Sequence, residues 1–123
     1  MEKEKKIVLI TGGTSGIGFG TIEYLLEQEC YEIISVSRGE ENIYSAKEKL
    51  GEEANKVIFL QGDIRKEEEC KKIYNEIQKK YDRLDGLVNS AGIIKSGGIE
   101  KQTLEEWNDS INTNLTGTFL MIQ

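Results

Sequence analysis

Short apolar runs alternate with helical patterns along most of this chain, and this alternation limits the possible folds more than any other feature. The apolar runs are rich in Ile, Val and Leu without regular polar alternation, and they lie at residues 7–10, 32–37, 56–61 and 84–89. Such runs are typical of strands that are buried on both faces of a parallel sheet. The helical patterns lie between them, at residues 17–29, 42–54 and 66–81. The alternation therefore predicts an α/β domain whose parallel strands are joined by right-handed crossovers.

A last helix is predicted from about Thr103 to the end of the sequence. Thr103 and Glu106 have the spacing of a capping box, in which Thr103 caps the helix and Glu106 reaches back. Apolar residues then recur every three or four positions and give one apolar face: Leu104, Trp107, Ile111, Leu115 and Phe119. The chain has no internal repeat, and its 123 residues are the length of one domain, so residues 1–123 are expected to form a single domain.

A glycine-rich segment, TGGTSGIG, joins the first apolar run to the first helical pattern. Its glycines permit a positive φ and remove side chains where a ligand approaches the backbone. The helix that follows directs free N–H groups and the positive end of its dipole toward an anion. The segment is therefore expected to bind phosphate, although a glycine-rich turn without a ligand is the simpler alternative. The candidate residues are Gly12, Thr14, Ser15, Gly16, Ile17 and Gly18.

The end of the second apolar run narrows the choice of nucleotide. The chain lacks the Gly-Lys-Ser/Thr triplet of triphosphate-binding loops, and the glycine segment does not have the GxGxxG spacing. Ser37 and Arg38 lie where an NAD site usually has a carboxylate, whereas an Arg accommodates the 2′-phosphate of NADP. We therefore expect NADP rather than NAD. Against this, Glu40 and Glu41 follow closely, and Arg38 also fits an ordinary surface charge.

Small and polar residues follow the third and fourth apolar runs. Asp63 fits two roles, either the N-cap of the next helix or an acceptor for the amino group of adenine. Asn89, Ala91 and Gly92 end the fourth run, and small residues there let the backbone approach a ligand. Open α/β sheets bind ligands at the carboxyl ends of their strands. These residues are therefore expected at the same edge of the sheet as the glycine segment.

In their order and spacing, the glycine segment, Asp63-Ile64, Asn89-Ser90-Ala91-Gly92 and Asn114 resemble the classical short-chain dehydrogenase/reductase family over essentially the whole chain. The resemblance implies a Rossmann-type doubly wound parallel sheet, with strands in the order 3-2-1-4, that binds NAD(P). It implies that the glycine segment holds the pyrophosphate and that Asp63 with Ile64 meets the adenine. It also implies that residues 89–92 support the strand beside the cofactor and that Asn114 belongs to the catalytic tetrad. Ser90 stands where the family more often has a second Asn.

The catalytic Ser and the Tyr-x-x-x-Lys motif of that family are missing from these 123 residues, since none of the five tyrosines has a Lys four residues later. Tyr44 has Lys47 three residues later, but its helix follows the second apolar run, near the adenine end of the cofactor. The resemblance therefore implies the cofactor-binding part of an oxidoreductase for a carbonyl or alcohol substrate. We expect this part to be truncated after about four strands and inactive by itself. A non-catalytic nucleotide-binding or interaction module is the alternative.

Composition limits the partners and the compartment. The net charge of −6 argues against nucleic acid, and the apolar runs are too short to span a membrane. The chain has no histidine, so we expect no metal site. Cys30 and Cys70, both placed in helical stretches, are interpreted as reduced thiols of a cytoplasmic protein.

Two apolar surfaces predict self-association, namely the unpaired edge of the fourth strand and the apolar face of the last helix. The substrate is not specified by the sequence, because residues 93–102 form only one wall of the expected cleft.

Overall fold

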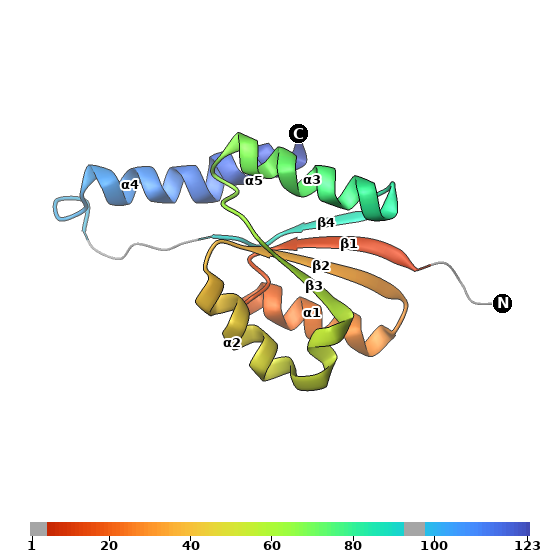
Figure 1. Cartoon of the computed structure of the whole chain (residues 1–123). Helices are drawn as coiled ribbons and strands as arrows, with labels where there is room; N and C mark the ends of the chain where they lie inside the picture. The colour runs from red at the N-terminus through yellow and green to blue at the C-terminus, as the bar shows by residue number, and fades with distance from the viewer. Residues whose placement is uncertain (1–4, 93–97) are drawn as a thin grey trace.

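Four parallel strands form the centre of the protein in a computed structural model, which describes residues 5–92 and 98–123. The strands are β1 (Lys6–Thr11), β2 (Tyr31–Ser37), β3 (Val57–Gln61) and β4 (Gly86–Asn89). They are arranged in the order β3-β2-β1-β4 (Figure 1). The predicted Rossmann-type sheet of order 3-2-1-4 is therefore confirmed. Half of the expected cleft wall, residues 93–97, lies outside the described residues.

Helices cover both faces of this sheet (Figure 1). Helices α1 (Gly16–Gln28) and α2 (Glu40–Leu50) lie on one face, and α3 (Glu67–Tyr81) lies on the other. A short 3₁₀ helix, η1 (Gly51–Lys56), leads from α2 into β3. A helix connects each strand to the next one in the sequence, and all strand pairs are parallel. The carboxyl ends of the four strands therefore lie at the same edge of the sheet.

The core is divided by the sheet into two hydrophobic clusters. Successive side chains of β1 point to opposite faces, as in any strand. Ile10 packs in the cluster that contains Ile22 of α1, whereas Leu9 packs in the cluster that contains Ile73 of α3. Continuous apolar runs are therefore needed here because both sides of each central strand are buried.

Two local predictions differ from the structure. Helix α1 ends at Gln28, because Glu29 adopts a left-handed conformation with φ of 56° and donates its N–H to Leu26. Cys30 therefore lies in the connection to β2, and its placement in a helix was wrong. Helix α2 spans Glu40–Leu50 rather than residues 42–54, because Gly51, with φ of 61°, ends the α-helical ladder.

The last helical stretch consists of three segments rather than one. Helix α4 (Leu104–Ile111) is followed by a π-helical segment, η2 (Asn112–Thr116), and then by α5 (Gly117–Ile122). Thr103 is the N-cap as predicted, and its Oγ1 accepts a hydrogen bond from the Glu106 N–H at 3.1 Å. The Glu106 carboxylate accepts from the Thr103 hydroxyl at 3.2 Å, which closes the cap through the two side chains.

The apolar face of α4 to α5 is largely uncovered in this chain. Leu104 is 73% exposed, Leu115 is 65% exposed and Phe119 is 60% exposed. By contrast, Met121 of α5 is buried, and the Tyr74 hydroxyl of α3 donates to its carbonyl oxygen. Helix α4 extends beyond the body of the sheet, whereas α5 lies beside α3 (Figure 1).

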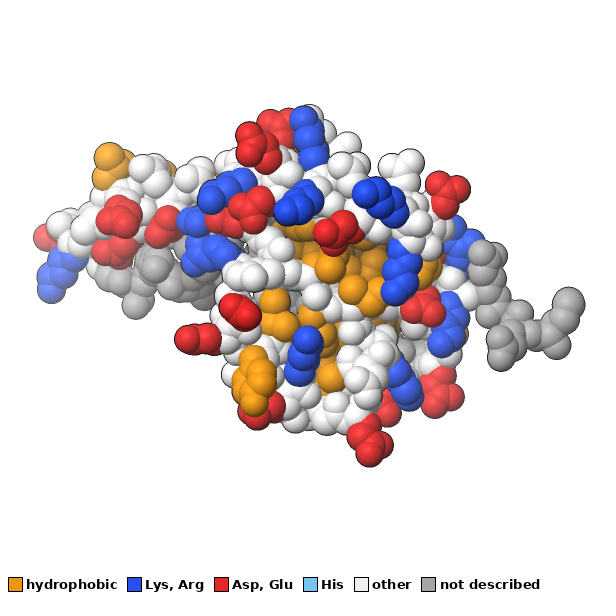
Figure 2. Space-filling model, in the orientation of Figure 1, with side chains coloured by type: hydrophobic (Ala, Val, Ile, Leu, Met, Phe, Trp, Pro, Cys, Tyr) orange, Lys and Arg blue, Asp and Glu red, His pale blue; other side chains and the backbone are white. Residues whose placement is uncertain are grey.

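Strands β4 and β3 are the two edge strands of the sheet. In β3, three side chains, Ile58, Phe59 and Leu60, are half-buried. Apolar side chains are accordingly visible between α3 and α2 on the face shown in Figure 2.

Within residues 5–92 and 98–123, no helix has both the length and the apolar character needed to cross a bilayer.

Candidate functional site

A cavity of about 270 Å³ opens at the carboxyl edge of the sheet. Nine of the residues predicted from the sequence line it: Gly12, Thr14, Ser15, Ser37, Arg38, Asp63, Ile64, Ala91 and Gly92. Six more lining residues were not predicted: Val36, Gly39, Asn42, Gly62, Arg65 and Thr113. The predicted residues Gly16, Ile17, Gly18, Asn89 and Asn114 lie outside this lining. The sequence therefore located the cavity but not all of its walls.

The glycine segment packs directly against the chain that leaves β4. Gly12 has φ of +68°, and a Cβ built on it would lie 2.6 Å from the Cα of Ala91. A Cβ on Gly18 would lie 2.3 Å from the carbonyl oxygen of Gly12 and 2.5 Å from the Oγ of Ser90. These distances are too short for any side chain, so glycine is required at both positions.

Ser90 and Thr11 hold the two loops together. The Ser90 hydroxyl donates to the carbonyl oxygen of Thr11, and the Ala91 N–H donates to the Thr11 hydroxyl at 3.2 Å. Ser90, which stands where the family more often has a second Asn, therefore forms a hydrogen bond that joins the two loops.

The first turn of α1 is free of competing anionic groups. Its N-cap, Ser15, makes no side-chain capping bond, and no acidic residue lies in the first turn. Helix α2 differs, since Glu40 and Glu41 lie in its first turn. The N-terminus of α1 therefore presents N–H groups without partners inside the helix, and a positive dipole end, beside the cavity that its N-cap Ser15 lines.

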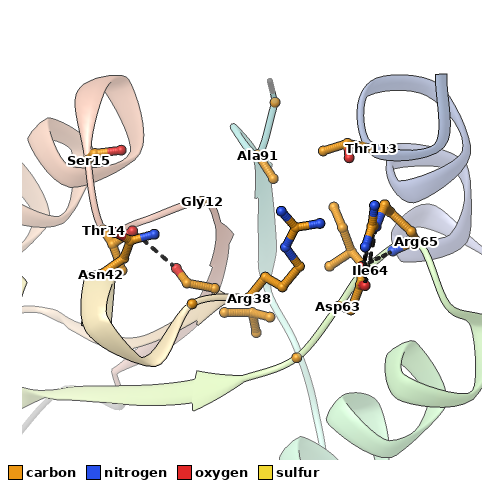
Figure 3. Close-up of a pocket in the computed structure, with 15 residues that line it drawn as sticks. Gly12, Thr14, Ser15, Arg38, Asn42, Asp63, Ile64, Arg65, Ala91 and Thr113 are labelled. Atoms are coloured by element: carbon orange, nitrogen blue, oxygen red, sulfur yellow. Dashed lines mark hydrogen bonds and ion pairs between the residues drawn. The ribbon is translucent and has the colours of Figure 1, made fainter. Parts of the chain in front are cut away.

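Arg38 supplies a positive charge to the cavity. Its guanidinium projects between Ala91 and Ile64 (Figure 3). Neither a hydrogen bond nor an ion pair engages this guanidinium among residues 5–92 and 98–123. Beside it, the Ser37 hydroxyl faces the Thr14 hydroxyl at 3.5 Å. Arg38 and these two hydroxyls form a group of donors next to the glycine segment.

Asp63 is held by Arg65 rather than acting as a helix cap. The Asp63 Oδ1 accepts from the Arg65 backbone N–H at 3.0 Å and from its Nε at 2.9 Å, while Oδ2 accepts from Nη2 at 2.8 Å. The N-cap of α3 is Lys66, so the possibility that Asp63 caps that helix was wrong. The side-chain hydrogen bonds from Arg65 hold the pKa of Asp63 below its usual value, which keeps this buried carboxyl ionised.

Arg65 also reaches the C-terminal helical stretch. Its Nη1 donates to Oδ1 of Asp109 in α4 at 3.1 Å. The side-chain hydrogen bonds to Asp63, drawn in Figure 3, raise the pKa of Arg65. Arg65 therefore links the loop after β3 to α4. The sequence signal for this role was an arginine two residues after an aspartate at the carboxyl edge of the sheet.

Thr113 and Asn114 lie in the π-helical segment η2. Such segments occur as single widened turns and are frequent at functional sites. The Asn114 side chain lies against Gly92, because a Cβ on Gly92 would be 3.1 Å from the Asn114 Oδ1. Asn114 thus lies beside the loop after β4, next to the cavity rather than in its lining. Thr113 lines the cavity and had no signal in the sequence, because it is one threonine within a helical pattern.

Comparisons with known proteins agree with this geometry. A family model described as short chain dehydrogenase matches residues 6–123. A 3beta-hydroxysteroid dehydrogenase of Mediterraneibacter gnavus is 33% identical over 117 residues, which are 94% of this chain and 42% of that protein. The 3-oxoacyl-[acyl-carrier-protein] reductase FabG of Thermotoga maritima is 33% identical over 123 residues, which are 100% of this chain and 50% of that protein.

Among solved structures, ElxO with NADP bound has a TM-score of 0.85 and 37% identity, covering 96% of this chain and 48% of ElxO. The chain therefore spans about half the length of the curated relatives that it matches.

Proposed function

This chain belongs to the short-chain dehydrogenase family, and from that premise we propose that it is the NADP-binding part of an oxidoreductase. The proposed reaction is hydride transfer between NADPH and a carbonyl or alcohol substrate. At the cavity on the carboxyl edge, Arg38 lies together with Gly12, Thr14 and Ser15 of the glycine segment, and Ser15 is the N-cap of α1. This association of backbone donors with a guanidinium that has no hydrogen bond or ion pair within the described residues is the observation that carries the proposal, because NADP presents a pyrophosphate and a 2′-phosphate. ElxO, which is similar in fold, has been solved with NADP bound.

The cavity fits part of the cofactor rather than all of it. Its volume of about 270 Å³ lies just under the range of roughly 300–1,000 Å³ typical of sites that enclose a whole small ligand. We place the adenosine in it, with Arg38, Ser37 and Thr14 toward the 2′-phosphate and with Asp63 and Ile64 toward the base. The pyrophosphate then lies over Gly12, Ser15 and the first turn of α1.

The remaining candidate residues extend this arrangement toward the reacting end of the cofactor. Gly16, Ile17 and Gly18 begin α1, and the Ile17 side chain is 84% exposed, so it offers apolar surface to a bound dinucleotide. Asn89, Ala91 and Gly92 support the strand beside the cofactor. Asn114 is proposed to hold a proton-relay position next to Gly92, while NADPH supplies the hydride when it is bound.

Cofactor binding is tested by calorimetry with NADP⁺, NAD⁺ and 2′,5′-ADP. We expect NADP⁺ to bind more tightly than NAD⁺, and we expect Arg38→Ala to remove this difference. Lys79→Ala is the matched control, because Lys79 is in the last turn of α3 and its loss changes the net charge by the same amount. Equal affinities of the unaltered chain for NADP⁺ and NAD⁺ would refute the role of Arg38.

Turnover by these 123 residues alone is not expected. No tyrosine in the sequence has a lysine four residues later, and that pair supplies proton transfer in the family resembled here. We propose that the purified chain binds NADPH but does not oxidise it in the presence of aldehydes and ketones. Steady loss of NADPH absorbance, above the rate without protein, would contradict this.

Self-association is proposed through the exposed apolar face of α4 to α5, with a second copy of the chain as the partner. Trp107 lies on this face and is 54% exposed. Sedimentation of the unaltered chain is expected to show dimers or larger species, and Leu115→Glu is expected to shift it toward the monomer. A monomer at all concentrations would oppose this proposal.

The two cysteines are free thiols, which favours the cytoplasm as the compartment.

A further inference from the structure

Thr113 carries a buried hydroxyl that has no hydrogen-bond partner in the part of the chain that the structure describes. Its side chain lines the cavity at the carboxyl edge, and the residue is only 9% exposed. Buried polar groups are nearly always hydrogen-bonded, so an unpaired hydroxyl in a cavity wall calls for an explanation.

One other buried hydroxyl, that of Ser35, is also unpaired among the described residues, but it has a different setting. A Cβ built on Gly13 would lie 2.3 Å from the Ser35 Oγ, so the Ser35 hydroxyl is covered by the glycine segment. Ser35 does not line the cavity. Of the two residues with an unpaired buried hydroxyl, Thr113 is therefore the one that belongs to the cavity wall.

The ion pairs of Arg65 hold the helix that leads into Thr113. Asp109 lies in α4, and η2, which contains Thr113, follows α4 directly. The Arg65 guanidinium joins Asp109 of α4 to Asp63 at the end of β3, with contacts of 3.1 Å and 2.8 Å. The helical stretch that carries Thr113 is thereby linked to the loop that carries Asp63, and both residues lie on the same side of the view in Figure 3.

The capacity of Asp63 to accept further hydrogen bonds is small. Its two oxygens already receive the backbone N–H, Nε and Nη2 of Arg65. The amino group of adenine has two N–H donors and lies beside the acceptor N1. One carboxylate that is largely occupied leaves part of this edge without a partner, so a further polar group in the cavity wall would add to its recognition.

We infer that the Thr113 hydroxyl is a second recognition group for the N1 and amino edge of adenine, an inference that rests on the proposed binding of NADP. Threonine in a helix divides between two χ1 rotamers, and rotation from one to the other moves the hydroxyl to a different staggered position on Cβ. The hydroxyl can thus turn toward a bound base without movement of the backbone. The apolar side chains of Val36, Ile64 and Ala91 offer contact surface for the ring.

The test uses Thr113→Val, which replaces the hydroxyl by a methyl group of similar size, and Thr113→Ser, which keeps the hydroxyl. Each variant and the unaltered chain are titrated with NADP⁺ and with 1,N6-etheno-NADP⁺, in which N1 and the amino nitrogen are joined in an extra ring. We expect Thr113→Val to weaken NADP⁺ binding about threefold to tenfold, the range of one net hydrogen bond. Thr113→Ser is expected to stay within about twofold, and the etheno analogue is expected to bind the Val variant and the unaltered chain equally.

Thermal unfolding without ligand separates this role from a structural one. An unpaired buried hydroxyl does not stabilise the free protein, so Thr113→Val is expected to unfold at the same temperature or higher. Equal losses of affinity for both nucleotides, no loss for either, or a lower unfolding temperature would overturn the role of Thr113. If the unaltered chain binds NADP⁺ and these outcomes occur, only this inference fails; if it does not bind NADP⁺, the proposed function fails with it.

Discussion

Removal of the Arg65 guanidinium is expected to destabilise the fold more than the loss of any surface ion pair. Arg65→Leu keeps a side chain of moderate size but leaves Asp63 ionised, buried and without its three side-chain contacts. It also removes the link to Asp109 in α4. The variant therefore tests whether the loop after β3 is held by charge pairing.

The magnitude lies between two limits. Breaking a fully buried ion pair costs about 3–5 kcal/mol, whereas an exposed pair contributes about 0–1 kcal/mol. The side chain of Arg65 is 24% exposed and that of Asp63 is 9% exposed, which places this pair nearer the buried limit. With the backbone N–H bond to Asp63 retained, we expect a loss of about 2–3 kcal/mol from an unfolding free energy of about 6–18 kcal/mol for a chain of this length.

The measurement is urea unfolding followed by circular dichroism at several pH values. Arg65 lowers the pKa of Asp63 in the fold, so its contribution is present above the unfolded pKa of about 3.9 and is lost as the pH falls through the folded pKa. Once Asp63 is protonated, the arginine no longer matters. The difference between Arg65→Leu and the unaltered chain should therefore be largest at pH 7 and should shrink as the pH is lowered through about 4.

Lys71→Leu is the matched control, because Lys71 forms an exposed ion pair with Glu67 at 3.4 Å. It should change the unfolding free energy by no more than about 0.5 kcal/mol. The reasoning is refuted if Arg65→Leu costs no more than this control, or if its cost is the same at pH 7 and at pH 3.5.

Three further substitutions test separate parts of the structure. Gly18→Ala should displace the glycine segment, because the new methyl group would lie 2.3 Å from the Gly12 carbonyl oxygen; calorimetry should show at least a tenfold loss of NADP⁺ affinity (about 1.4 kcal/mol), and unchanged affinity would contradict the packing. Thr103→Ala should lower the unfolding free energy by about 1 kcal/mol in urea, through loss of the cap on the Glu106 N–H, and a neutral result would count against that cap. Tyr74→Phe should cost about 1 kcal/mol and increase hydrogen exchange in α5, whereas unchanged exchange there would show that the hydroxyl does not hold this helix.

Features that depend on local periodicity were predictable from the sequence, whereas those that depend on a distant partner were not. The parallel α/β arrangement follows from buried apolar runs separated by helices, and the loop after β1 follows from its glycines, whereas the strand order was implied by the resemblance to the family. The reversal at Glu29 was not predictable, because a non-glycine residue with positive φ is uncommon and glutamate gives no signal for it. The link from Arg65 to Asp109 joins residues 44 positions apart, so it became visible only when α4 was placed against the loop after β3.

The single helix predicted after Thr103 illustrates the same limit. Apolar residues at intervals of three and four indicate a helical face, but they do not show where a turn widens to the π-helical form. The widened turn at η2 contains both Thr113, which lines the cavity, and Asn114, which lies against Gly92. Beyond this turn, Met121 of α5 packs in the cluster that contains Ile73 of α3, while Leu115 of η2 remains exposed.

Net charge is a poor guide to the ligand of this protein. The chain carries a formal charge of −6, yet the ligand proposed for its cavity is an anion. The apparent conflict is resolved by where each charge lies. Arg65 is neutralised by Asp63 and Asp109, whereas Arg38 points into the cavity without such a pair among residues 5–92 and 98–123. Backbone N–H groups at α1 add attraction at short range, where screening by salt is weak, and distant carboxylates are screened over about 10 Å. A few oriented donors can therefore outweigh an excess of negative charge spread over the rest of the surface.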